Sequence, residues 1–176
     1  MREDPCAICR GLGLGRFFGE GFPWRGVEGG PEPPEVARLE PLHGKRSVLT
    51  RYIDQWLYRC PSCGNWYEYK RRTDSFYGNT DYELESVEWL APSEAIQRLA
   101  SEGAEDEKTA TERGAPAIID RLLADLHDND PALRESAEKM LIREFRSIER
   151  LKAPDALPPV EMIEERVRQR WKGSVA

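Results

Sequence analysis

The residues best suited to chemistry are four cysteines arranged in two pairs, with two residues between the members of each pair. One pair lies in Cys6-Ala-Ile-Cys9 and the other in Cys60-Pro-Ser-Cys63, and the 176-residue chain has no further cysteine. A thiolate is a soft ligand, and a spacing of two residues lets one tight turn present both sulfurs to the same ion. Two such pairs in one chain are typical of a Zn²⁺ ion held by four cysteines.

The predicted ligands, Cys6, Cys9, Cys60 and Cys63, would form a closed metal site. Four protein ligands leave no open position for water on a tetrahedral ion, so we expect one structural Zn²⁺ per chain and no catalytic role for the metal. Fifty residues, 10–59, separate the two pairs, which is long for a compact zinc-binding unit. Because the entropy of loop closure grows only with the logarithm of loop length, the insertion does not prevent both pairs from sharing one ion.

The same four cysteines allow two other interpretations. A C-x-x-C pair can lower the pKa of a thiol and act as a dithiol redox centre. A disulfide would require an oxidising compartment, but the first residues, Met1–Cys6, have none of the features of a secretory signal. The sequence also has no apolar run near the roughly 20 residues of a membrane-spanning helix. We therefore expect a cytoplasmic location, no membrane contact and reduced thiols that bind zinc.

The residues around both cysteine pairs resemble known zinc-binding units. The pattern C-x-x-C-x-G-x-G over residues 6–13 resembles one zinc-binding repeat of the DnaJ-type chaperones, and the likeness covers these eight positions. The pattern C-P-x-C-G over residues 60–64 resembles a zinc-ribbon knuckle, in which Gly64 tolerates the positive φ that such a turn often needs. Paired knuckles on one ion make a zinc-ribbon or rubredoxin-like unit, so the resemblance implies a small antiparallel sheet beside the metal.

Charge is distributed unevenly along the chain. The net charge of −6 argues against a general nucleic-acid binder. Residues 43–73 nevertheless contain seven Lys or Arg against two Asp or Glu, whereas residues 74–108 contain ten Asp or Glu against two Lys or Arg. Basic and aromatic side chains together can attract phosphates and stack on bases. The candidate contacts for nucleic acid or another partner are Lys70, Arg71, Arg72, Trp66, Tyr67 and Tyr69.

Hydrophobic patterning predicts an α+β chain that begins with a zinc-ribbon-like sheet. The Gly- and Pro-rich residues 10–46 predict an irregular loop, and helical spacing predicts a helix over 47–55. Strands are then predicted from Trp56 into the second cysteine pair, from Trp66 to Arg72, and from Tyr82 to Trp89. This zinc-binding domain is expected to occupy residues 1–100, with Pro92 at the start of a helix.

The remainder of the chain predicts a small helical bundle. Polar residues 101–114 predict a linker, and residues 115–176 predict a helical hairpin followed by a last helix from Pro159 to Trp171. Pro116 is expected to begin the first of these helices, and Asp130 to cap the second, with Pro131 in its first turn.

The stretch 122–141 resembles one HEAT-type helical hairpin, on the features D-x-D-P, Arg134, Ala137 and Leu141. The resemblance covers one hairpin, and a solenoid needs about three repeats, so it implies a single hairpin rather than an array. Glu144, Glu164 and Glu165 lie on Arg-rich helix faces and are predicted to form solvated ion pairs.

The motifs favour a non-enzymatic role. The sequence contains no phosphate-binding loop, nucleophile elbow or H-E-x-x-H helix. We therefore expect a zinc-stapled adaptor that binds a protein partner, with an inhibitor or immunity-type binder as one form of it. A nucleic-acid-binding zinc ribbon and a dithiol redox protein are the alternative hypotheses.

Overall fold

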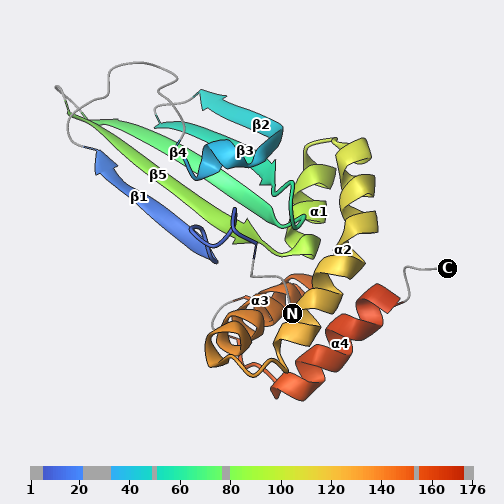
Figure 1. Ribbon diagram of the computed structural model, residues 1–176. Helices are drawn as coiled ribbons and strands as arrows, with labels where there is room; N and C mark the ends of the chain where they lie inside the picture. Colours follow the sequence, from blue (N-terminus) through green and yellow to red (C-terminus); the bar gives the residue numbers. More distant parts are fainter. Residues whose placement is uncertain (1–5, 22–32, 49–50, 77–79, 153–154, 173–176) are drawn as a thin grey trace. The chain divides into compact units, whose positions relative to one another are not determined.

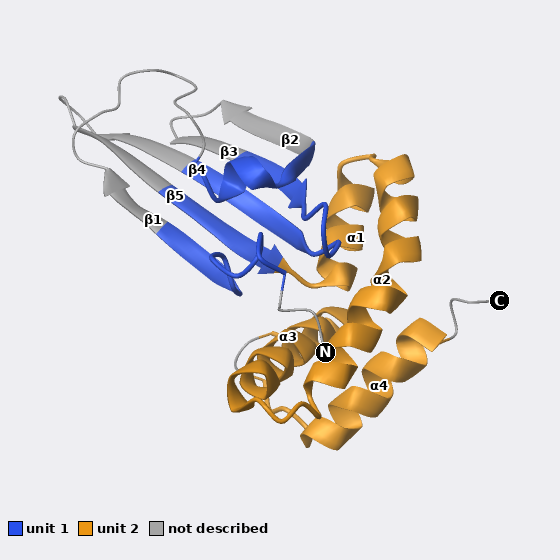
Figure 2. Cartoon of the chain, in the orientation of Figure 1, with its two compact units in different colours: residues 1–89 blue, residues 90–176 orange. Residues whose placement is uncertain are grey.

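The computed structural model divides the chain into two compact units, residues 1–89 and residues 90–176 (Figure 2). The first unit contains a β-sheet and the second contains four α-helices, which confirms the predicted α+β class. The parts of the chain that the structure describes are residues 6–21, 33–48, 51–76, 80–152 and 155–172.

The first unit is a five-stranded antiparallel sheet with the strand order β1-β5-β4-β3-β2 (Figure 1). A short 3-10 helix, η1 (Val36–Arg38), precedes β2. The strands are β1 (Gly15–Gly21), β2 (Glu40–Val48), β3 (Arg51–Arg59), β4 (Trp66–Phe76) and β5 (Thr80–Leu90).

Aromatic pairs hold β3 and β4 in register. Tyr58 lies opposite Tyr67, and Trp56 lies opposite Tyr69. The rings of Trp56 and Tyr69 stack with their centroids 5.5 Å apart, and Tyr58 meets Tyr69 edge to face at 6.2 Å. Cross-strand pairs of this kind stabilise a sheet beyond the area they bury. The register also fixes the turn at residues 60–64, because that turn joins these two strands.

Two predictions for the first unit are wrong. The predicted helix over 47–55 is replaced by the end of β2 and the start of β3, since the aromatic residues of β3 pair with those of β4. The irregular loop predicted over 10–46 contains β1 and much of β2. Both are edge strands, so each needs only one neighbour for its backbone hydrogen bonds. The strands predicted after Trp66 and Tyr82 are confirmed as β4 and β5.

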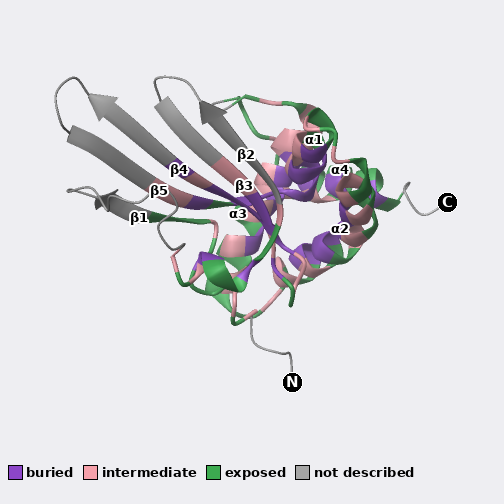
Figure 3. Ribbon diagram, turned by 90° about the horizontal axis from the view of Figure 1, so that it is seen from above, coloured by how far each residue is buried: buried purple, intermediate pink, exposed green. Residues whose placement is uncertain are grey.

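The second unit contains α1 (Pro92–Ser101), α2 (Glu105–Asp125), α3 (Pro131–Glu149) and α4 (Val160–Lys172). The predicted start of α1 at Pro92 is confirmed. The predicted cap of α3 is confirmed as well, because the Asp130 side chain accepts a hydrogen bond of 2.8 Å from the N–H of Ala132. Figure 3 colours the buried residues, which in α2, α3 and α4 include Ile119, Leu122, Leu141, Phe145, Ile163 and Val167.

Most of the polar segment 101–114, which was predicted as a linker, is helical, because α2 begins at Glu105. Three acidic residues in its first turn, 105–107, suit the positive end of the helix dipole. Pro116 therefore lies inside α2 and does not begin it, contrary to the prediction.

Arg134 stabilises the turn between α2 and α3. Its side chain donates hydrogen bonds of 2.7 and 3.1 Å to the backbone oxygens of Asp128 and Asn129.

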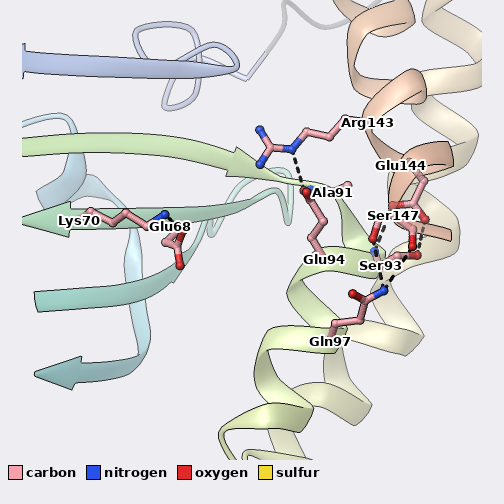
Figure 4. A network of polar contacts seen from close by, with 9 residues as sticks. All are labelled: Glu68, Lys70, Ala91, Ser93, Glu94, Gln97, Arg143, Glu144 and Ser147. Atoms are coloured by element: carbon pink, nitrogen blue, oxygen red, sulfur yellow. Dashed lines mark hydrogen bonds and ion pairs between the residues drawn. The ribbon is translucent and has the colours of Figure 1, made fainter. Parts of the chain in front are cut away.

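A buried carboxylate joins three helices of the second unit. Figure 4 shows its contact with Ser93. Glu144 of α3 accepts hydrogen bonds from the backbone N–H of Ser93 at 3.1 Å and from its hydroxyl at 2.6 Å. The indole N–H of Trp171, near the end of α4, donates a third bond of 2.9 Å. The prediction of a solvated ion pair for Glu144 is therefore wrong, whereas the predicted pairing of Glu164 with arginine is confirmed at Arg168.

Candidate metal centre

The N-terminal knuckle, residues 6–13, is a series of tight turns that directly precedes β1. The N–H groups of Cys9 and Arg10 both donate to the backbone oxygen of Cys6, each at 3.0 Å. The N–H of Gly13 donates to the oxygen of Cys9 at 3.0 Å, and Gly13 has a φ of +52°. These bonds turn the chain back on itself, so that both sulfurs of the pair are presented on one side.

The second knuckle, residues 60–64, turns the chain from β3 into β4. The N–H of Gly64 donates to the oxygen of Cys60 at 2.9 Å, and the N–H of Cys60 donates to the oxygen of Asn65 at 2.8 Å. Gly64 has a φ of 75°, which confirms the expected need for glycine after the second cysteine. The pairing of β3 with β4 therefore places this knuckle at a defined end of the sheet.

The two knuckles bring all four thiols to one point. The sulfurs of Cys6, Cys9, Cys60 and Cys63 all lie within 4.8 Å of one another. Sγ of Cys6 lies 3.5 Å from Sγ of Cys60, and Sγ of Cys9 lies 3.5 Å from Sγ of Cys63. Tetrahedral zinc with bonds of about 2.3 Å to sulfur requires sulfurs about 3.8 Å apart. The cysteines are free rather than disulfide-bonded, and their arrangement fits a metal ion.

The electrostatics of the cluster also favour a cation. The contact with Cys63 and burial raise the pKa of the Cys9 thiol far above its usual range. Burial likewise raises the pKa of Cys60. Burial alone would raise the pKa of Cys6, but nearby N–H groups and the Ser62 hydroxyl lower it on balance. Several thiolates crowded together repel one another, and a divalent cation removes that repulsion.

The basic and aromatic residues predicted to contact a partner are mostly in the interior. Trp66, Tyr67 and Tyr69 are buried, so their rings are not exposed for stacking on bases. Arg71 is also buried and pairs with Glu85 of β5 at 3.1 Å. At this position, a residue of the acidic segment 74–108 thus neutralises a residue of the basic segment 43–73.

The other two basic candidates are Lys70 and Arg72. Lys70 pairs with Glu68 on its own strand at 2.5 Å (Figure 4). The side chain of Arg72 lies outside the described residues. Tyr67 contacts the N-terminal knuckle, because its hydroxyl donates a 3.3 Å hydrogen bond to the backbone oxygen of Gly13. The sequence pattern does not indicate this role, although Tyr67 follows the second knuckle closely.

The fold and the cysteine cluster define the class of this protein: an α+β chain with a four-cysteine cluster typical of a zinc knuckle site. Comparison with protein-family models, with curated proteins and with solved structures finds no match for the chain. Within the described parts of the chain, no helix has the length and apolar character needed to cross a membrane.

Proposed function

We propose that Cys6, Cys9, Cys60 and Cys63 bind one Zn²⁺ and that the ion has a structural role. The observation that carries this proposal is the convergence of four sulfurs within 4.8 Å from segments 54 residues apart. Four cysteine ligands complete a tetrahedron, so no position is left at which water could be activated. The ion would stabilise the fold by cross-linking these two segments.

The strand order supports a structural role for the ion. The N-terminal knuckle leads into β1, and the second knuckle joins β3 to β4. In the sheet, β5 lies between β1 and β4. An ion held by both knuckles would therefore connect segments on either side of β5 and close a long loop of the chain, which lowers the entropy of the unfolded state.

We further propose that the zinc-stapled chain is a non-enzymatic module that binds a protein partner. The residues that could take part in catalysis have structural roles in this chain, which supports a binding role. Among the described residues, the cysteine cluster is the single group of three or more His, Cys, Asp or Glu that could hold a metal. The buried Glu144 is occupied with donors from two other helices. The burial of Trp66, Tyr67 and Tyr69 favours a protein partner over nucleic acid.

Metal content tests the zinc proposal directly. Protein purified without added metal is expected to contain one zinc per chain, with four thiols that react only after chelation or denaturation. The measurements are elemental analysis and titration of free thiols on the same sample. A chain with no metal and two or more reactive thiols would contradict the proposal and favour the dithiol redox hypothesis.

Affinity capture from native lysate tests the binding proposal. The zinc-loaded chain is expected to retain one protein partner in stoichiometric amount, and a Cys60→Ser chain, with an incomplete metal site, is expected to retain less of it. Binding to DNA and RNA should be measured over a salt series in parallel. Nucleic-acid binding that falls steeply with salt, without a protein partner, would instead support the nucleic-acid hypothesis.

A further inference from the structure

The hydroxyl group of Tyr67 lies against the cysteine cluster, although Tyr67 is not one of the four ligands. It belongs to β4, and its side chain is 1% exposed. The hydroxyl donates a hydrogen bond of 3.3 Å to the backbone oxygen of Gly13. A group on the sheet thus reaches the backbone of the N-terminal knuckle, which carries two of the four ligands.

We propose that Tyr67 is a positioning residue for the metal, because its hydroxyl holds the N-terminal knuckle in place against the sheet. This inference rests on the proposed zinc site and adds a residue to it. Groups outside the ligand set that hold the ligands in place affect metal affinity strongly. Tyr67 is suited to this role because its strand also emerges from the second knuckle.

This hydrogen bond joins two parts of the metal site that are 54 residues apart in the sequence. Gly13 is the last residue of the N-terminal knuckle, and its N–H donates to the backbone oxygen of Cys9 at 3.0 Å. The Tyr67 hydroxyl therefore restrains the turn that presents the Cys9 sulfur.

The surroundings of the ring make this hydrogen bond effective. Tyr67 lies opposite Tyr58 on β3, so the strand register fixes where its side chain points. Burial of the side chain excludes water that would otherwise compete for the hydroxyl. A hydrogen bond in such a low-dielectric interior is stronger than one in water, and an unpaired hydroxyl there is costly. The energetic effect should therefore appear in metal binding.

Tyr67→Phe in the full-length chain tests the proposal, and Tyr69→Phe is the matched control. Tyr69 lies two residues along the same strand, is equally buried, and its pKa responds to burial, Glu85 and Arg71 rather than to the cysteines. Each substitution removes one buried hydroxyl and no carbon atom. The probes are Zn²⁺, with affinity measured against a chromophoric chelator, and Co²⁺, whose sulfur-to-metal charge-transfer band reports on the thiolates.

Tyr67→Phe is expected to weaken zinc binding by about tenfold or more, as for other residues that support metal ligands. Its Co²⁺ charge-transfer band is expected to shift, because a knuckle that the sheet no longer holds presents its thiolates to the metal in a different geometry. Tyr69→Phe should leave both quantities unchanged. The band position depends on the sulfurs and not on the stability of the fold, so it separates positioning from general packing.

Three results would overturn the inference. The first is a Tyr67→Phe chain with the affinity and spectrum of the unaltered protein. The second is a loss of affinity without a band shift, or an equal loss in Tyr69→Phe, since either would come from folding alone. The third is an unaltered chain that takes up neither Zn²⁺ nor Co²⁺. The third result needs no substitution, so it would show that the zinc proposal itself fails rather than the role of Tyr67.

Discussion

Replacing Cys60 by serine is expected to abolish tight zinc binding and to release the N-terminal knuckle from the sheet. Cys60 is buried, and its sulfur lies 3.5 Å from that of Cys6. Serine offers a neutral hydroxyl in place of a soft thiolate, so only three of four ligands remain. Loss of a structural metal is among the most damaging single changes, and we expect the free energy of unfolding to fall by about 4 kcal/mol or more.

Hydrogen exchange and metal analysis measure this effect separately. Amide protection should be lost first in residues 6–15, which the ion would hold, while residues 92–149 should keep their protection. Ala7→Ser is the matched control, because it adds a serine hydroxyl at an exposed position of the N-terminal knuckle and keeps all four thiols. A Cys60→Ser chain with one tightly bound zinc and unaltered protection in residues 6–15 would be incompatible with the proposed site.

Glu144→Ala is expected to destabilise the helical unit by about 3 to 5 kcal/mol. The substitution removes the acceptor for three donors, namely the N–H and hydroxyl of Ser93 and the indole N–H of Trp171. Each buried donor left without a partner costs about 1 to 3 kcal/mol. Urea unfolding followed by circular dichroism measures the change. Glu138→Ala removes an exposed carboxylate from the same helix and should have little effect; an equal effect of both substitutions would refute the role of Glu144.

Glu144 also determines how the stability of the helical unit is expected to change with pH. Burial raises the pKa of Glu144 above its usual range, and the negative charge of Glu94 acts in the same direction, although Ser93 and Trp171 donate to the carboxylate. Glu94 itself pairs with Arg143 at 2.7 Å. A raised pKa means that the folded state holds the proton more tightly. Its contribution to stability is therefore full below the unfolded pKa of about 4.3 and is lost as the pH rises through the folded pKa.

A Glu144→Gln chain provides the comparison for that pH dependence. Glutamine keeps one acceptor oxygen but cannot titrate, so its stability should change less than that of the unaltered chain as the pH is raised from about 4 to 7. The Glu138→Gln chain should follow the unaltered protein. Identical pH profiles for the unaltered and Glu144→Gln chains would show that Glu144 has an ordinary pKa.

Local chemistry in the sequence determined the cysteine pairs, several element ends and the fold class. Two residues between cysteines make a turn whose sulfurs converge whatever surrounds it, and the four predicted thiols do lie together. Pro92 and the Asp130 cap act within one helical turn, so their effects are visible without tertiary contacts. The strand that leaves the second knuckle was predictable for the same reason, since its aromatic residues follow the turn directly.

Other features were decided by tertiary pairing. The apolar residues at 52, 53, 56 and 57 fit a helical period as well as a strand, and the pairing of β3 with β4 selects the strand. The glycine-rich β1 has little intrinsic preference for a strand and forms one by pairing with β5. The polar start of α2 likewise lacks an apolar period, yet it continues into a packed helix.

Tertiary structure also decided which polar side chains are buried. Glu144 resembles a surface glutamate in the sequence, because its donors lie on residues 51 positions before it and 27 positions after it. Tyr67 resembles a surface aromatic beside basic residues, but the sheet directs its hydroxyl toward a knuckle 54 residues away. The sequence determined which groups could bind a metal and where turns and helix ends fall. Long-range packing decided which side chains surround them, because burial depends on contacts between distant segments that no local pattern records.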